Sequence, residues 1–305
     1  MAAMASIRLS IVIPHLNQPV YLARCLSALA PQVALMPGVE AIVVDNGSKE
    51  LPIDVCSRHA WVRLEQEATP GPGPARNRGI AAARGPLLAF IDADCIPHGN
   101  WLGSLAGEFA ANASTRVIGG DVRIGLADPA RPTALEAYES VFAYRQREYI
   151  KKMGFSGTGN LAMRRETYDL VGPFAGIEIA EDRDWGRRAT ALGVPIKYLE
   201  TMIVYHPARQ SFAELCKKWD RHVSHDYEEL PGGPAGKIKW AGLAAAVAVS
   251  SLVDTWRIIA SVRITTPRER LLAAAILARI RLYRSRRMLA QLFRVDRLSR
   301  SWNRT

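Results

Sequence analysis

The sequence has only four cysteines, and their spacing matches neither a metal site nor a disulfide framework. No closely spaced CxxC pair occurs among the four, which are Cys25, Cys56, Cys95 and Cys216. A disulfide-stapled secreted domain and a cysteine-ligated zinc protein are therefore excluded. The first eight residues also lack a basic segment followed by an apolar run, so no secretory signal is visible. These absences indicate a protein of the reducing cytoplasm.

The sequence also has no long apolar run at its C-terminal end. The uncharged, alanine-rich stretch Trp240–Val253 has 14 residues, whereas a helix needs roughly 20 apolar residues to span a bilayer. Asp254 and Arg257 interrupt any extension. Two interpretations stay open, an interfacial or re-entrant membrane helix and a buried helix of an appended bundle.

Acids and lysines are scarce in the last fifty residues. From Thr255 to Thr305 there are 13 arginines, no lysine and two acids, and this excess equals the net charge of +11 of the whole chain. Such a tail suits nucleic acid or an anionic membrane surface. The interleaved aromatic residues of a nucleic-acid platform are sparse, since the tail has only Trp256, Tyr283, Phe293 and Trp302. We therefore expect no nucleic-acid partner.

The membrane hypothesis is placed on residues 271–293. We expect this helix to lay its apolar stripe on the bilayer or on the catalytic domain. Its arginines would then meet lipid phosphates or water: Arg279, Arg281, Arg284, Arg286 and Arg287. The protein would be cytoplasmic, or peripheral on the inner face of the cell membrane.

Apolar strands alternate with helical patterns through the first two hundred residues. Ile7–Ile13 and Ala41–Val44 read as buried strands, and the helical spacing between them ends before Pro31. Further strands are expected near 61–64, 86–91 and 116–122, and helices near 75–83, 101–111, 134–150 and 181–192. This alternation predicts an α/β fold, a mostly parallel Rossmann-like sheet with helices on both faces. We expect a catalytic domain over residues 1–210 and a helical basic extension over 211–305.

Asp92-Ala93-Asp94 follows one of these apolar strands directly. Two carboxylates two positions apart at the carboxyl end of a strand suit a small, hard cation that also binds phosphates. Transfer of a sugar from a nucleoside diphosphate requires such a positive charge, because negative charge builds up on the leaving diphosphate. The segment therefore has the form of a DxD motif.

Several segments, in their order along the chain, resemble family 2 glycosyltransferases. The first group comprises Ser10–Pro14 (SIVIP), Val43–Ser48 (VVDNGS), Ala75–Ile80 (ARNRGI) and Phe90–Asp94 (FIDAD). A second group resembles the acceptor-side elements: Gly159-Asn160 with Arg164-Arg165, Glu181-Asp182 with Arg188, and Val204-Tyr205-His206. The resemblance covers about residues 6–210. It implies a GT-A fold, a Mn²⁺ or Mg²⁺ ion, and inversion at the anomeric carbon.

The resemblance also implies roles for individual residues. Asp94 would be the direct metal ligand, with His206 completing the metal site and Asp92 binding the donor or supporting the metal through water. Asp182 would be the catalytic base, with Glu181 as its substitute. The other residues expected at the donor or acceptor are Pro14, Asp45, Asn46, Arg76, Asn77, Ala93, Gly159, Asn160, Arg187 and Arg188. Asn46 departs from the pattern, since many members have a second aspartate there.

The function expected is a metal-dependent inverting glycosyltransferase that uses a nucleoside diphosphate sugar, with UDP or dTDP favoured. The acceptor would be a saccharide or a lipid-linked molecule, in bacterial polysaccharide or glycolipid synthesis. Two alternatives stay open. One is a nucleotidyltransferase of related fold, although Pro14–Asn17 replaces the glycine-rich loop that such enzymes carry after the first strand. The other is a basic scaffold protein that binds membrane or nucleic acid.

Overall fold

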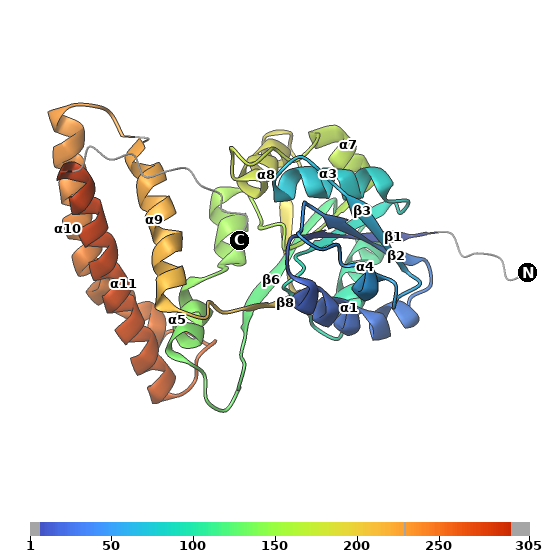
Figure 1. Ribbon diagram of the computed structural model, residues 1–305, viewed down its shortest axis with the longest axis horizontal. Helices are drawn as coiled ribbons and strands as arrows, with labels where there is room; N and C mark the ends of the chain where they lie inside the picture. The colour runs from blue at the N-terminus through green and yellow to red at the C-terminus, as the bar shows by residue number, and fades with distance from the viewer. Residues whose placement is uncertain (1–6, 229, 294–305) are drawn as a thin grey trace, which may run out of the picture. The chain divides into compact units, whose positions relative to one another are not determined.

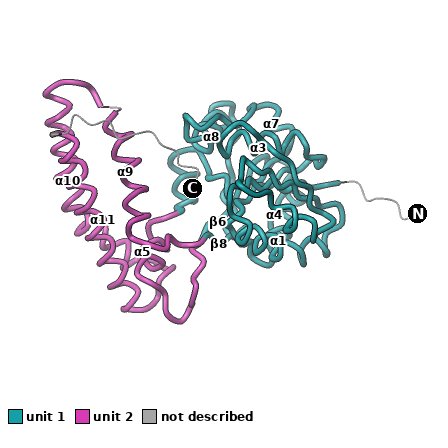
Figure 2. Tube along the Cα trace, viewed as in Figure 1, with its two compact units in different colours: residues 1–123, 144–206 teal, residues 124–143, 207–305 magenta. Residues whose placement is uncertain are grey.

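The structure, a computed structural model, describes residues 7–228 and 230–293 and divides into two compact units (Figure 2). Unit 1 comprises residues 1–123 and 144–206, and unit 2 comprises 124–143 and 207–305. The segment 124–143 belongs to unit 2 because its helix α5 (Ala134–Phe142) packs against α11 (Pro267–Phe293). The domain boundary expected after residue 210 stays a prediction.

Unit 1 is built on an eight-stranded sheet. The strands are β1 Leu9–His15, β2 Val39–Asp45, β3 Val62–Gln66, β4 Leu87–Ile91, β5 Ile96–Pro97, β6 Val117–Gly125, β7 Asn160–Arg164 and β8 Ile196–Pro207. The helices are α1 Pro19–Ala34, α2 Ile53–Cys56, α3 Pro72–Ala82, α4 Trp101–Ala111, α6 Gln146–Glu148, the π-helix η1 Tyr149–Met153, α7 Arg165–Val171 and α8 Glu181–Ala191.

The strand order is β3-β2-β1-β4-β7-β6-β8-β5. Strands β1 to β4 run parallel, joined by the helical crossovers that the sequence predicts. β7 runs antiparallel between β4 and β6, and β5 runs antiparallel to β8. The sheet is therefore mixed, and its parallel half brings the carboxyl ends of β1, β2 and β4 to one edge.

Both faces of the sheet are covered. In β1, Ile11 and Ile13 pack against α1 and α4, whereas Val12 points to the opposite face, toward α3 and α8. β4 alternates in the same way, with Ile91 on the first face and Phe90 on the second. This period of two, with apolar residues on both faces, explains why these strands read as continuous apolar runs.

Two expected helices have different ends. α1 continues through Pro31 to Ala34, because Gln32 is buried and joins the start of α4: its Oε1 accepts from the Leu102 amide at 2.9 Å. The helix expected over residues 134–150 is broken. It ends at Phe142, and Tyr144 has a left-handed backbone with φ of 47°.

Unit 2 consists of α5, α9 (Phe212–Glu228), α10 (Pro234–Ile259) and α11, and Figure 1 shows the last three side by side. The apolar stripe of α11 is buried against α5 and α9 through Ala273, Ile276, Leu277 and Ile280. Part of the stripe is therefore covered within unit 2 itself, whereas Leu271, Leu282 and Leu289 are exposed. Its expected placement on a bilayer or on the catalytic domain stays a prediction. Trp302 and the rest of 294–305 lie outside the described residues.

α10 carries most of the exposed large apolar side chains of unit 2 among the described residues. It is 26 residues long, with a mean hydropathy of 1.4 over its most apolar window, and is long and apolar enough by composition to cross a membrane. The sequence suggested a shorter element because Asp254 interrupts the apolar run. In the structure Asp254 points inward and accepts a hydrogen bond from Arg281 at 2.5 Å, so the helix continues past it.

Candidate active site

Polar side chains follow β1, β2 and β4 at the edge where these parallel strands end. His15 closes β1, Asp45 closes β2, and Asp92 and Asp94 follow β4. Pro14, also at this end of β1, is paired in register with Val44. These side chains therefore lie at one edge of the sheet in unit 1.

Asp45 is held rigidly at the end of β2. Its Oδ2 lies 3.0 Å from Nδ1 of His15, and its Oδ1 accepts from the amides of Gly47 and Ser48. Burial acts to raise the pKa of Asp45, but the hydrogen bonds from Ser48, His15 and Gly47 outweigh it and the pKa is lowered. Asp45 is therefore a fixed carboxylate at neutral pH.

Asn46 holds the loop that enters α3. Its Nδ2 donates to the carbonyls of Glu67 and Thr69, at 3.0 and 2.8 Å, and its Oδ1 accepts from the Gly71 amide at 2.7 Å. Every polar atom of the amide thus has a partner within the protein. The residue shapes the rim of the site through this loop.

Asp94 and His206 face each other. Oδ2 of Asp94 lies 3.3 Å from Nε2 of His206, and Tyr144 packs its ring on that imidazole with centroids 4.6 Å apart. Oδ1 of Asp94 is buried and has no hydrogen-bond partner among the described residues. Burial raises the pKa of Asp94, His206 lowers it, and Asp92 raises it further. An oxygen left unsatisfied in this way costs stability unless a donor or a cation meets it.

Arg76 joins the two acidic pairs of the site. It is almost fully buried at the start of α3, and it donates to Oδ1 of Asp92 at 2.8 Å and to Oε1 of Glu181 at 2.7 Å. Burial acts to lower the pKa of Arg76, but the two carboxylates outweigh it and raise the pKa. The end of β4 and the start of α8 are thus fixed to one guanidinium.

Asp182 stands next to Glu181 in the first turn of α8. Burial, then repulsion from Glu181, raises the pKa of Asp182 to about 6, although the Arg183 amide donates to its Oδ1 at 2.7 Å. A carboxylate with this pKa is ionised at neutral pH and is more basic than an ordinary aspartate. It can therefore accept a proton from a hydroxyl more readily.

The absence of a side chain at Gly159 leaves room for the carboxylate of Asp92. A Cβ at this position would lie 2.5 Å from Oδ2 of Asp92, closer than any real contact. Ala93, between the two aspartates, is buried in the core. The position of the Asp92 carboxylate thus depends on residue 159 being a glycine.

Three other expected site residues make structural bonds. Asn77 bonds to both backbone groups of Phe174, and Asn160 accepts from Nε1 of Trp101 at 2.8 Å. Arg188 donates to the carbonyls of Val171 and Pro173. Arg187, by contrast, is exposed, and no bond from its side chain is found within residues 7–228 and 230–293.

The residues present fit a divalent cation in part. Among residues 7–228 and 230–293 there is no cluster of three or more acidic, histidine or cysteine side chains that would hold a metal ion. Asp94 and His206 form a pair instead, and the free Oδ1 of Asp94 is the hard oxygen ligand that Mn²⁺ or Mg²⁺ prefers.

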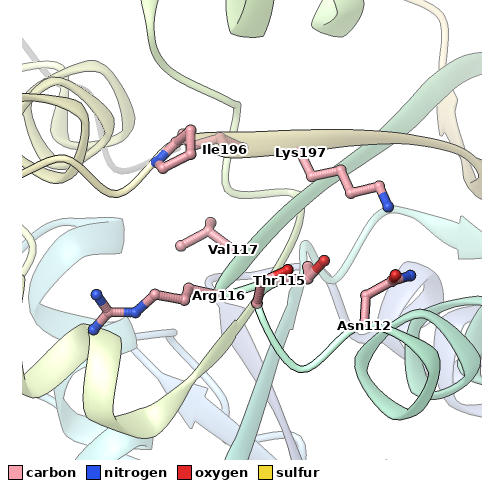
Figure 3. Close-up of a pocket in the computed structure, with 8 residues that line it drawn as sticks. Asn112, Thr115, Arg116, Val117, Ile196 and Lys197 are labelled. Atoms are coloured by element: carbon pink, nitrogen blue, oxygen red, sulfur yellow. The ribbon is translucent and has the colours of Figure 1, made fainter.

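A separate depression of about 280 Å³ lies elsewhere on unit 1 (Figure 3). It is lined by Asn112, Ser114, Thr115, Arg116, Val117, Pro195, Ile196 and Lys197. Val117 pairs with Met163, and Met163 with Leu88, which is one residue from the amino end of β4. Asp92 follows the other end of β4, so this depression is not part of the acidic site.

Sequence reasoning missed His15 and Tyr144. His15 resembles an ordinary loop residue after a strand, and only the parallel pairing of β1 with β2 brings it to Asp45. Tyr144 stood within a helix expected to be continuous. Its contact with His206 depends on the break in that helix.

The chain is similar to known glycosyltransferases. The model of the family described as "Glycosyl transferase family 2" matches residues 10–172. Glycosyltransferase AglE of Haloferax volcanii is 34% identical over 215 residues, which cover 68% of this chain and 69% of that protein.

Solved structures share the fold. A mannosyltransferase from Pyrobaculum calidifontis, in complex with GDP-Man and Mn²⁺, has a TM-score of 0.57 at 17% identity, covering 93% of this chain and 86% of its own. Glucosyl-3-phosphoglycerate synthase from Mycobacterium tuberculosis, in complex with Mg²⁺ and UDP, has a TM-score of 0.50 at 25% identity, covering 68% of this chain and 74% of its own. These matches confirm the expected GT-A fold.

Proposed function

The chain belongs to glycosyl transferase family 2 and is a glycosyltransferase, and from this premise we propose that it is metal-dependent and inverting. In this proposal a sugar passes from a nucleoside diphosphate to an acceptor hydroxyl at the site of Asp92, Asp94 and Asp182. The observation that carries it is the pair of hydrogen bonds that Arg76 donates to Asp92 and Glu181. These bonds join the metal-side and base-side carboxylates in one site.

Asp94 and His206 would hold Mn²⁺ or Mg²⁺, with Asp92-Ala93-Asp94 acting as a DxD motif. The cation supplies positive charge for the leaving diphosphate. Asp92 is oriented by its ion pair with Arg76 and would face the donor beside Gly159. Support comes from the unpartnered Oδ1 of Asp94 and from the metal and nucleotide in the complexes of the similar proteins.

Asp182 would act as the base. As the acceptor oxygen attacks the anomeric carbon, its proton passes to a carboxylate oxygen of Asp182, and the bond from that carbon to the diphosphate breaks on the opposite side. Glu181 is occupied by Arg76, which leaves Asp182 as the free carboxylate of the pair. The raised pKa of Asp182 supports this assignment.

We propose UDP or dTDP as the favoured donor nucleotide. Asp45 and Asn46 would lie against its nucleoside. The acceptor would be a saccharide or a lipid-linked molecule of a bacterial polysaccharide or glycolipid pathway. The test is consumption of UDP-, dTDP- and GDP-sugars with Mn²⁺ or with EDTA. Consumption of one donor, only with metal, supports the proposal, whereas equal consumption in EDTA contradicts metal dependence.

We further propose that unit 2 meets an anionic membrane through α10 rather than α11. Its apolar side chains stand out of the unit, with Leu252 80% and Trp256 59% exposed. Lys237 and Lys239 lie near its start and Arg257 near its end, where they would meet lipid phosphates. Sedimentation with anionic vesicles that Leu252→Asp abolishes would support this placement. Equal sedimentation of the variant would contradict it.

A further inference from the structure

Arg284 of α11 is a guanidinium without a counter-ion in unit 2. Within residues 7–228 and 230–293 it makes no hydrogen bond or ion pair, and its Nε is buried. The neighbouring arginines of the helix differ, since Arg281 is paired with Asp254 and Arg287 with Asp220. Cζ of Arg284 instead lies over the ring of Trp219, 3.5 Å from the ring centroid.

A second cation reaches the same indole from α9. Nζ of Lys218 lies 5.7 Å from the centroid of the Trp219 ring, and no carboxylate is paired with it in the described part of the chain. Burial, with repulsion from Arg209, Arg221 and Arg284, lowers the pKa of Lys218 to about 8, although Glu139 acts to raise it. Two cations thus share one ring while repelling each other.

Trp219 adds an unused donor to this group. Its Nε1 is buried and has no acceptor among the described residues. One turn from Lys218 stands His222, whose ring packs on Trp219 with centroids 5.4 Å apart. Burial, then Lys218, lowers the pKa of His222, so this imidazole is kept neutral by its surroundings at pH 7.

The nearby acids are already used by other groups. Glu139 of α5 accepts from the backbone and side chain of Arg209, and Asp220 accepts from Tyr283 and Arg287. Asp226 acts on His222 and Arg284 only at longer range, and Asp254, which also acts on Arg284, is paired with Arg281. Lys218 and Arg284 therefore lie against Trp219 without a hydrogen-bonded carboxylate of their own in the described part of the chain.

We propose that Lys218, Trp219 and Arg284 form a binding site for a phosphate group, carried by a soluble phosphate or by a lipid headgroup. A guanidinium and an ammonium are the cations that proteins use for phosphate, and the indole N–H provides a further donor. The site lies within unit 2 and does not depend on the transfer reaction. A bound phosphate would supply the counter-charge that Arg284 and Lys218 lack.

The test follows the indole N–H signal of Trp219 by NMR in the full chain, with EDTA present. Trp219→Phe assigns this signal among the seven tryptophans. Inorganic phosphate is one probe, and vesicles of phosphatidylcholine with phosphatidic acid are the other, with pure phosphatidylcholine as the blank. We expect a saturable shift, and roughly tenfold weaker binding in Arg284→Gln and in Lys218→Met.

Arg286→Gln is the matched control, since Arg286 is an exposed arginine of the same helix. Thermal unfolding adds a second readout: phosphate should raise the melting temperature of the wild type and of Arg286→Gln, but not that of Arg284→Gln. A shift with phosphate in solution identifies a soluble ligand, and a shift only with phosphatidic acid identifies a headgroup. No shift with either probe, or equal affinity in Arg284→Gln and Arg286→Gln, overturns the proposal.

Discussion

Oε1 of Glu181 accepts a hydrogen bond from Nη1 of Arg76 at 2.7 Å, although the two residues are 105 positions apart in the chain. The other side of the guanidinium donates to Asp92. Because Arg76 is almost fully buried, its charge depends on both carboxylates. This contact fixes the first turn of α8 to the end of β4 and thereby sets the distance across the site.

Replacing Arg76 with methionine should destabilise the protein by about 3 kcal/mol, because two carboxylates lose their shared partner inside the site. Urea unfolding measures the change. Arg78→Met is the control on the same helix. Its exposed pair with Glu65 should contribute about 0.5 kcal/mol or less. Equal losses in the two variants would show that Arg76 does not organise the site.

Removing the Asp94 carboxylate should weaken cation binding. We expect Asp94→Ala to weaken Mn²⁺ binding in the presence of UDP by roughly 100-fold, and His206→Ala to weaken it by roughly tenfold. Electron paramagnetic resonance of free Mn²⁺ measures both. Asp169→Ala, at an exposed carboxylate of α7, should bind as the wild type does. Unchanged binding in Asp94→Ala would place the cation elsewhere.

Adding one methyl group at Gly159 should displace Asp92. Its Cβ would lie 2.5 Å from Oδ2 of Asp92, so the carboxylate must turn away from its position beside Arg76. We expect Gly159→Ala to raise the KM for the donor roughly tenfold and to cost about 1 kcal/mol of stability. Gly176→Ala, where a Cβ meets open space, should change neither. Steady-state kinetics measures the change in KM, and thermal unfolding measures the change in stability.

Asp182 should reduce stability at neutral pH. Its pKa is about 6 in the folded protein, against an ordinary value of 3.8, so the folded state binds the proton more tightly than the unfolded state. Stability therefore falls as the pH rises from about 4 to 6 and stays lower above that range. Asp182→Asn should be more stable than the wild type by about 2 kcal/mol at pH 7.5 and no more stable at pH 4. A gain independent of pH would contradict this origin.

The strand-end segments up to Asp94 could be placed at one edge of the sheet from the sequence, because each motif is local in sequence. Apolar runs, polar turns and the DAD segment lie within a few residues of one another, and the parallel order of the strands brings them together. The Arg76 bridge could not be predicted, since it depends on how α8 returns over the sheet. The same holds for the helix break at Tyr144, and for α11, whose apolar stripe shows no sign in sequence of being covered by α5.

The most direct test compares transfer and donor binding in Asp182→Asn, with the donor that the wild type consumes. The account predicts that the variant binds donor and Mn²⁺ as tightly as the wild type while its kcat falls roughly 1000-fold or more. In the wild type, kcat/KM should decrease as the pH falls below about 6, where Asp182 becomes protonated. Transfer by Asp182→Asn at the wild-type rate would contradict the assignment of the base and, with it, the proposed mechanism.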